Sequence, residues 1–220
     1  MREMVAAIKA IAQHLAAEVG KATLDDRVLR VMAKVPRHEF VPVEVKPYAY
    51  LNRPLPIGFD KTISQPLMVA VMTDLLELRP DDLVLEVGTG LGYQSAVLAE
   101  LAGRVYSVEI IEELAQRAVQ RLKRQGYANI DVRVGNGYFG WPEYAPFDKV
   151  IVTAASDLIP PPLIYQLKGG GRMVLPVGLP DAQKLVVVDK DLNGRVGTKE
   201  IMRVLFSLLE GSDQPTLRPS

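Results

Sequence analysis

The hydrophobic positions along the chain follow two different periods. From residue 66 onwards, helical patterns over 66–79, 92–102 and 111–125 alternate with short apolar runs over 83–87, 104–109, 130–135 and 148–154. Apolar residues three and four positions apart indicate helices, whereas short apolar runs between turn residues indicate buried strands. This alternation predicts an α/β protein with a mainly parallel sheet that is covered by helices on both faces.

The two ends of the chain depart from this alternation. Helical patterns in "MVAAIKAIAQHLAAEV" and "DDRVLRVMAKV" precede a Pro- and aromatic-rich stretch, which predicts an irregular but ordered segment over the core. After a short helix around "PLIYQL", the stretches "GRMVLPVG", "KLVVVDKD" and "KEIMRVLFSLL" predict strands, the last one a strand or strand pair, that end the sheet in an antiparallel hairpin. We expect a single domain over 1–220, with an N-terminal segment over 1–65, an α/β core over 66–210 and a polar tail over 211–220.

Composition limits the kinds of function. The 26 Lys and Arg balance the 26 Asp and Glu, so no overall field favours nucleic acid or an anionic membrane. Cysteine is absent and only His14 and His38 are present, which argues against a thiolate nucleophile and against a metal site. Charged residues such as Arg2, Glu3 and Lys9 interrupt the apolar stretch that a signal peptide needs. No run reaches the 18 apolar residues of a membrane-spanning helix. We therefore expect a cytoplasmic protein without a membrane partner.

The stretch "LVLEVGTGLGYQSAVLAEL" contains the central motif. Gly88, Gly90 and Gly92 lie between a predicted strand, in which Glu86 is the fourth residue, and a predicted helix. Glycine allows a sharp turn and a close approach to a ligand, and in a doubly wound sheet this turn lies at the edge where ligands bind. The spacing differs from the G-x-G-x-x-G dinucleotide fingerprint and from a P-loop. It predicts another nucleotide-type cofactor rather than a plain tight turn.

Two polar residues follow the next strands at the same edge. Glu109 ends one strand, where its carboxylate could hold a ribose; alternatively, it is an acid favoured by the dipole of the helix that follows. Asn136 stands between glycines in "GNGYFG", where its amide could read the edge of an adenine; alternatively, it occupies a left-handed turn.

The stretch "GFDKTISQP" places hydroxyl side chains directly before a predicted helix. One interpretation is helix capping, with Ser64 as the N-cap and Pro66 in the first turn. The other interpretation is a functional site, which depends on the rest of the chain.

The glycine loop, the strand-end acid and the later polar residue together resemble class I S-adenosylmethionine-dependent methyltransferases. The order of "VPRHEFVP", "LPIGFDKTISQP", "LEVGTGLGYQ", "VGNGYFGWPEYAPFDKVIVTAA" and "LIYQLKGGGRMVLPVG" resembles the protein-L-isoaspartate (D-aspartate) O-methyltransferase family. The resemblance runs from about Val35 to Gly178 and continues more loosely to Gly211. It implies a Rossmann-like fold with a seven-stranded sheet, S-adenosylmethionine as cofactor, and methylation of the free α-carboxylate of isoaspartyl residues in damaged proteins.

The resemblance also implies roles for particular residues. Ser64, with Thr62 beside it, is implied as the catalytic residue that aims the carboxylate. Implied cofactor contacts are Ser64, Gln65, Pro66, Glu86, Gly88, Thr89, Gly90, Gly92, Glu109, Ile110, Asn136 and Gly137. Implied substrate contacts are Thr62, Ser64, Val177, Ser207 and Leu208. A monomer is the plain expectation for such an enzyme, and isoaspartyl proteins are its expected partners.

The chain departs from the family pattern at a few positions. Asn136 stands where Asp is usual, Leu91 stands where Ser is usual, and Ser207 and Leu208 stand at the Val and Pro positions of the late strand. The departures at Ser207 and Leu208 affect the expected peptide contacts more than the cofactor site. A class I methyltransferase acting on RNA or a small molecule remains an alternative, as does a binding module without activity. The fourth strand lacks the Asn/Asp-Pro-Pro-aromatic motif of amino-methylating nucleic-acid enzymes.

Overall fold

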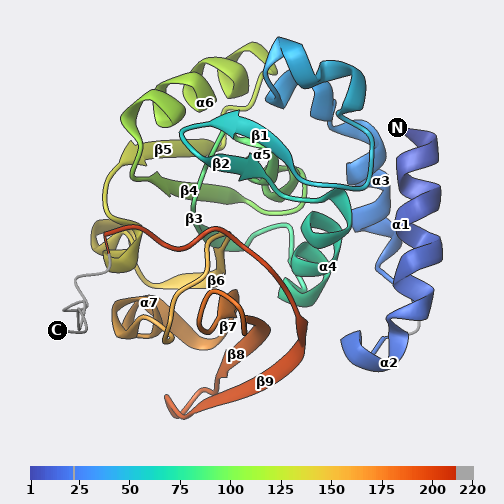
Figure 1. The fold of residues 1–220 in the computed structure, drawn as a ribbon. Helices are drawn as coiled ribbons and strands as arrows, with labels where there is room; N and C mark the ends of the chain where they lie inside the picture. Colours follow the sequence, from blue (N-terminus) through green and yellow to red (C-terminus); the bar gives the residue numbers. More distant parts are fainter. Residues whose placement is uncertain (22, 212–220) are drawn as a thin grey trace, which may run out of the picture.

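The computed structural model describes residues 1–21 and 23–211, which fold around a seven-stranded sheet (Figure 1). The strand order is β5-β4-β3-β6-β7-β8-β9. The strands are β3 (Leu83–Val87), β4 (Arg104–Glu109), β5 (Ile130–Val134), β6 (Phe147–Val152), β7 (Leu167–Val177), β8 (Lys184–Lys190) and β9 (Val196–Arg203). The first five in this order are parallel, and β8 and β9 are antiparallel to their neighbours. The predicted fold class and its C-terminal antiparallel hairpin are confirmed.

Helices follow the strands as the alternation predicted, with shorter bounds. They are α4 (Pro66–Leu76), α5 (Tyr93–Ala99), α6 (Glu112–Arg124) and α7 (Pro161–Gln166), with short 3-10 helices η3 (Gly137–Phe139) and η4 (Pro142–Tyr144). Helix α4 ends three residues before the predicted position, because Glu77 adopts a left-handed conformation with φ 53°. Alternate residues of the strands point to opposite faces. Val84 belongs to the core beneath α4, α5 and α6, and Leu85 to the core beneath α7.

The N-terminal segment packs on the same core as α4. It consists of α1 (Arg2–His14), α2 (Ala16–Val19), α3 (Asp26–Lys34), the 3-10 helices η1 (Arg37–Phe40) and η2 (Val43–Tyr48), and the antiparallel strands β1 (Leu55–Gly58) and β2 (Lys61–Ile63). Met4, Phe40 and Leu76 are buried in one cluster, and α1 lies beside α4 in Figure 1. The predicted irregular, ordered segment is confirmed, and it contains a small β1–β2 hairpin that the sequence pattern did not predict.

The end of the sheet differs from the prediction. Strand β9 ends at Arg203, and residues 204–210, here called the strap, leave the sheet and cross the carboxyl edge of the sheet. The buried Gln183 side chain holds the chain after this exit: it donates to the Phe206 carbonyl at 3.0 Å and accepts from the Phe206 N–H at 2.6 Å. The side-chain amide thus takes the place of a strand partner. Of the predicted polar tail, residues 212–220 lie outside the described residues.

Candidate active site

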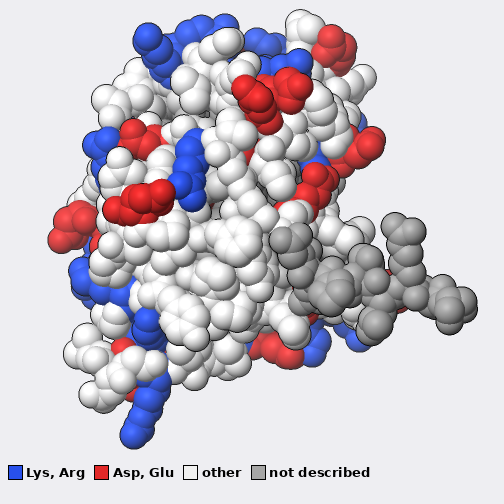
Figure 2. Space-filling view, turned by 90° about the vertical axis from the view of Figure 1, so that its left-hand side faces the viewer, with Lys and Arg blue, Asp and Glu red and all other residues white. Residues whose placement is uncertain are grey.

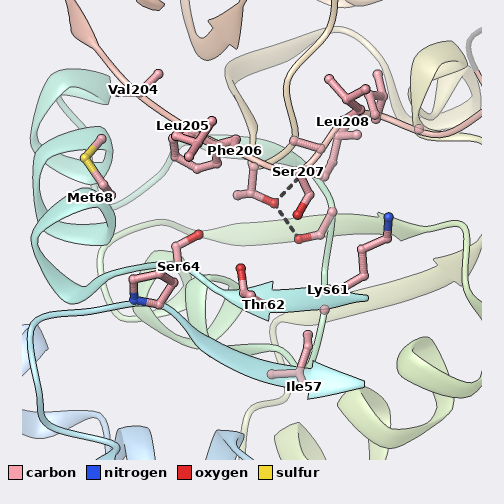
Figure 3. Close-up of a pocket in the computed structure, with 18 of the residues that line it drawn as sticks. Ile57, Lys61, Thr62, Ser64, Met68, Val204, Leu205, Phe206, Ser207 and Leu208 are labelled. Atoms are coloured by element: carbon pink, nitrogen blue, oxygen red, sulfur yellow. Dashed lines mark hydrogen bonds between the residues drawn. The ribbon is translucent and has the colours of Figure 1, made fainter. Parts of the chain in front are cut away.

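A cavity of about 580 Å³ opens at the carboxyl edge of the sheet. It lies where the strand order reverses, between β3 and β6. Ligands of doubly wound sheets bind at such switch points. The glycine loop, the end of β4, strand β2 and the strap all contribute to the cavity wall, as Figure 3 shows in part. Segments that are far apart in the sequence therefore meet at one site.

The glycine loop forms the wall nearest the sheet. Gly88 and Gly90 line the cavity and have φ values of 94° and 55°. A Cβ atom on Gly88 would lie 2.3 Å from the Thr153 Oγ1 atom, so this position accepts only glycine without movement. The Thr153 hydroxyl lies 2.8 Å from the Gly88 carbonyl oxygen and 3.1 Å from that of Val87. The loop backbone is thus held close to the cavity, as a cofactor-binding loop requires, while Leu91 packs in the core.

Glu109 lies at the end of β4 and lines the cavity. Its carboxylate accepts hydrogen bonds from the Gly90 N–H at 2.8 Å and the Ile111 N–H at 3.0 Å. Burial raises the pKa of this carboxyl, and the two backbone donors oppose that rise. The carboxylate therefore joins the glycine loop to the start of α6, and its remaining lone pairs are available to a ligand.

Glu86 does not lie in the cavity wall, contrary to the prediction of direct cofactor contact. Its side chain is fully buried and accepts hydrogen bonds from Ser95 and, at 2.6 Å, from Ser107. The Ser107 oxygen also lies 2.6 Å from the Thr89 hydroxyl. The reason is the strand pleat, which turns Glu86 toward α5 while the next residue, Val87, lines the cavity. Burial raises the pKa of Glu86 to about 8, so the carboxyl is largely protonated at neutral pH.

Asn136 also differs from the expectation of an adenine contact. Its side-chain oxygen accepts the Tyr138 N–H at 3.0 Å, and its amide donates to the Gly211 carbonyl. Asn136 has φ −76°, so the alternative of a left-handed turn is wrong as well. The residue caps η3 and holds the end of the described chain, while its neighbour Gly137 lines the cavity.

Ser64 and Thr62 line the cavity, and the capping interpretation of Ser64 is wrong. The N-cap of α4 is Gln65, which makes no side-chain cap bond, and Pro66 is the first helical residue. The Asn52 side chain instead accepts the Leu67 N–H at 3.0 Å. The hydroxyls of Thr62 and Ser64 are directed toward the strap (Figure 3).

The strap forms the opposite wall. The Ala155 N–H donates to the Ser207 carbonyl at 2.8 Å, and the Leu209 N–H donates to the Ala155 carbonyl at 2.7 Å. At its far end, Glu210 forms an ion pair with Lys61 of β2. The strap is therefore hydrogen-bonded to the chain after β6 and ion-paired with the β1–β2 hairpin across the cavity.

The structure brings most of the predicted site residues together. The cavity wall includes Thr62, Ser64, Gln65, Gly88, Gly90, Glu109, Ile110, Gly137, Ser207 and Leu208. It does not include Pro66, Glu86, Thr89, Gly92, Asn136 and Val177. Val177 ends β7 and pairs with Ser156 through an isolated bridge, so its predicted peptide contact has no support in this geometry.

Other residues at the site were not found by sequence reasoning. Lys61, Thr153 and Ala154 line the cavity, and Asn52 and Gln183 hold the segments that do so. Thr153 directly follows the buried strand β6 at the switch point, and this position could have predicted that it lines the site. Asn52 and Gln183 lie in loops, and nothing in their local sequence marks their partners.

Residues 1–21 and 23–211 contain no group of three His, Asp or Glu side chains that could hold a metal ion. Within the same residues, no helix is long and apolar enough to cross a membrane.

The cavity fits the cofactor that the sequence pattern implies. It combines an apolar wall, the glycine loop, where there is no room for side chains, and the Glu109 carboxylate at the end of β4. The volume of about 580 Å³ is of the size that small cofactors occupy. Fold and site together define the class of Rossmann-like, S-adenosylmethionine-dependent methyltransferases.

Comparisons with known proteins identify the family within this class. The sequence model of the protein-L-isoaspartate (D-aspartate) O-methyltransferase family matches residues 10–214. Protein-L-isoaspartate O-methyltransferase 1 of Polaromonas sp. is 64% identical over 212 residues, which cover 96% of this chain and 90% of that protein. Protein-L-isoaspartate O-methyltransferase 2 of Syntrophobacter fumaroxidans is 57% identical over 210 residues, which cover 95% and 85%.

Solved structures agree with this assignment. A protein-L-isoaspartate O-methyltransferase structure superimposes with a TM-score of 0.82 at 28% identity, covering 96% of this chain and 66% of that chain. A Plasmodium falciparum structure, named as a beta-aspartate methyltransferase in complex with S-adenosyl-L-homocysteine, has the same fold with a TM-score of 0.75 at 24% identity, covering 84% and 91%.

The chain therefore belongs to the protein-L-isoaspartate (D-aspartate) O-methyltransferase family. It is an enzyme that transfers a methyl group from S-adenosylmethionine to isoaspartyl residues of damaged proteins and so initiates their repair. This family assignment excludes the alternatives of an RNA or small-molecule methyltransferase and of an inactive binding module.

Proposed function

We propose that the cavity brings the isoaspartyl α-carboxylate and the cofactor together between the β1–β2 hairpin and the strap. The observation that carries this assignment is the position of Thr62 and Ser64. Both line the same cavity as Gly88 and Gly90, and their hydroxyls are directed toward the strap (Figure 3). The carboxylate then lies between these hydroxyls and the glycine loop.

The chemistry of this step requires orientation rather than proton transfer. A carboxyl group with an ordinary pKa of about 4 is ionised at neutral pH, so its oxygen needs no base. When bound, S-adenosylmethionine supplies an electrophilic methyl carbon on a sulfonium. A carboxylate oxygen forms a bond to that carbon while the carbon–sulfur bond breaks and its electron pair stays on sulfur. The products are a thioether and a neutral methyl ester, and no proton moves.

The hydroxyls of Ser64 and Thr62 suit this task. Each can donate one hydrogen bond to the carboxylate, which fixes its direction of approach. A neutral donor also leaves the anionic charge on the nucleophile, whereas a guanidinium partner would hold the carboxylate more tightly in the ground state. These residues act on the substrate, so their loss is expected to lower turnover.

The cofactor contacts follow from the same geometry. We assign the backbone of Gly88 and Gly90 to the methionine part and the Glu109 carboxylate to the ribose hydroxyls. Gln65, Ile110 and Gly137 line the remaining wall, with Gly137 at the adenine end. Glu86 and Thr89 support the glycine loop from the side away from the cavity, because both are hydrogen-bonded to Ser107. Ser207 and Leu208 of the strap contact the peptide.

Methyl transfer to two matched peptides tests this proposal. One peptide contains isoaspartate, the other contains normal aspartate, and the label is carried by the methyl group of S-adenosylmethionine. Base-labile label that appears on the isoaspartyl peptide, and appears about 10- to 100-fold more slowly with Ser64→Ala, supports the proposal. Label that persists unchanged in a folded Ser64→Ala variant contradicts the assigned role of Ser64, and label on the aspartyl peptide contradicts the substrate.

We also propose that the enzyme works in the cytoplasm as a monomer, without nucleic-acid or membrane partners. The equal numbers of acidic and basic residues support the absence of nucleic-acid and membrane partners. On the face shown in Figure 2, Lys and Arg side chains are mixed with Asp and Glu around a central area that has neither. Sedimentation at several protein concentrations tests the monomer, and cell fractionation tests the compartment.

A further inference from the structure

Arg37 is a buried cation beside the active site. Its side chain is 0% exposed, and it takes part in no ion pair among the described residues. The guanidinium donates from Nε to the Ala49 carbonyl at 2.8 Å and from Nη2 to the Ser64 carbonyl at 2.7 Å. Its carbon Cζ lies 4.9 Å from the centre of the Tyr93 ring, and Nη1 has no hydrogen-bond partner within residues 1–21 and 23–211.

A stabilising role alone does not explain the buried Arg37 cation. Burying an ion without a counter-ion lowers the stability of the folded state, and an apolar side chain of similar volume avoids that penalty. Burial lowers the pKa of Arg37 to about 10, so the group is still charged at neutral pH. Two carbonyl oxygens and one aromatic face offset only part of the lost hydration, since Nη1 has no partner in the described part of the chain.

The contacts of Arg37 converge on the active site. Ser64 lies on the substrate side of the cavity, directly before α4. Tyr93 is the first residue of α5 and directly follows the glycine loop. The planar guanidinium fixes the directions of its donors. It can therefore hold the Ser64 carbonyl at a set position relative to the loop that binds the cofactor.

We propose that Arg37 is a positioning residue for methyl transfer, which holds the Ser64 backbone so that its hydroxyl is aligned with the bound cofactor. This inference rests on the proposed role of Ser64. Arg37 does not line the cavity, so it acts on the substrate only through Ser64. A small displacement is enough to matter, because a 1 Å misplacement of a catalytic group costs about 100-fold in rate.

A double-mutant cycle tests the inference. The variants are Arg37→Lys, which keeps the charge but loses the fork, Ser64→Ala, and the two together. Turnover and KM are measured with an isoaspartyl peptide, cofactor affinity by calorimetry, and stability by urea unfolding. We expect Arg37→Lys to lower kcat by about 10-fold or more with cofactor affinity within about 2-fold, and to cause no further loss in the Ser64→Ala background.

A matched control separates positioning from general stability. Arg172 is partly buried, and its Nη1 donates to the Leu75 carbonyl at 3.2 Å, but it does not line the cavity. Unlike Arg37, it forms ion pairs with Glu77 and Asp189. Arg172→Lys is expected to lower stability and to leave kcat unchanged. If Arg37→Lys does not fold, Arg37→Gln enters the same cycle, because it keeps a donor and buries no charge.

The outcomes distinguish the inference from the proposed function. Equal losses of kcat from Arg37→Lys in both backgrounds overturn the positioning role and leave the role of Ser64 intact. Unchanged kcat in Arg37→Lys overturns it as well. Unchanged kcat in Ser64→Ala overturns the proposed function of Ser64, and any loss caused by Arg37→Lys then has another origin.

Discussion

Gly88→Ala tests whether the loop needs glycine because of a collision or because of backbone strain. The added Cβ would lie 2.3 Å from Thr153 Oγ1, at a residue with φ 94°. The backbone term for a non-glycine residue in the left-handed region is about 1–2 kcal/mol. Displacing the Thr153 hydroxyl from the Gly88 and Val87 carbonyls adds about 0.5–1.5 kcal/mol for one net hydrogen bond. We therefore expect a loss of about 1.5–3.5 kcal/mol in the free energy of unfolding.

The control and the assay follow from the same geometry. Gly126 has φ 83° and nothing within 4 Å of an added Cβ, so Gly126→Ala reports the backbone term alone. Urea unfolding gives both losses, and calorimetry gives cofactor affinity, which is expected to weaken at least tenfold only in Gly88→Ala. Thr153→Ala is expected to cost stability in the wild type but to restore part of it in Gly88→Ala. Equal losses in the two glycine variants, or full additivity with Thr153→Ala, refute the collision argument.

Three further changes have defined outcomes. Ser64→Ala removes the hydroxyl that orients the carboxylate, so steady-state kinetics should show kcat about 10- to 100-fold lower with cofactor affinity unchanged. Asn52→Ala removes the acceptor of the Leu67 N–H, and urea unfolding should show a loss of about 1 kcal/mol with α4 retained by circular dichroism. Glu86 binds its proton more tightly in the folded protein, with a pKa of about 8 against an ordinary 4.5, so its contribution to stability is complete below pH 4.5 and lost as pH rises toward 8. Glu86→Gln should flatten that part of the urea-unfolding pH profile, and an unchanged slope would contradict the raised pKa.

The local pattern of apolar and turn residues was sufficient to predict much of the fold. Strand β4 was predicted at its observed bounds, 104–109, because apolar periodicity and the flanking turn residues agree there. The glycine loop was also recognisable, since three glycines between a strand and a helix have a direct backbone reason. The last strand was predicted too long, because the Gln183 side chain that takes over the bonds of Phe206 lies 23 residues away along the chain.

The sequence by itself determined the order of helices and strands, the glycine loop and the set of residues at the carboxyl edge, because these depend on periodicity and on short-range spacing. Only the tertiary structure decided which of those residues face the cavity. The pleat of β3 buries Glu86, Asn136 turns back to Tyr138 and Gly211, and Asn52 satisfies the helix terminus in place of Ser64. In each case the decisive partner is set by packing or by a hydrogen bond, and the direction of a polar side chain depends on where its partner lies in space.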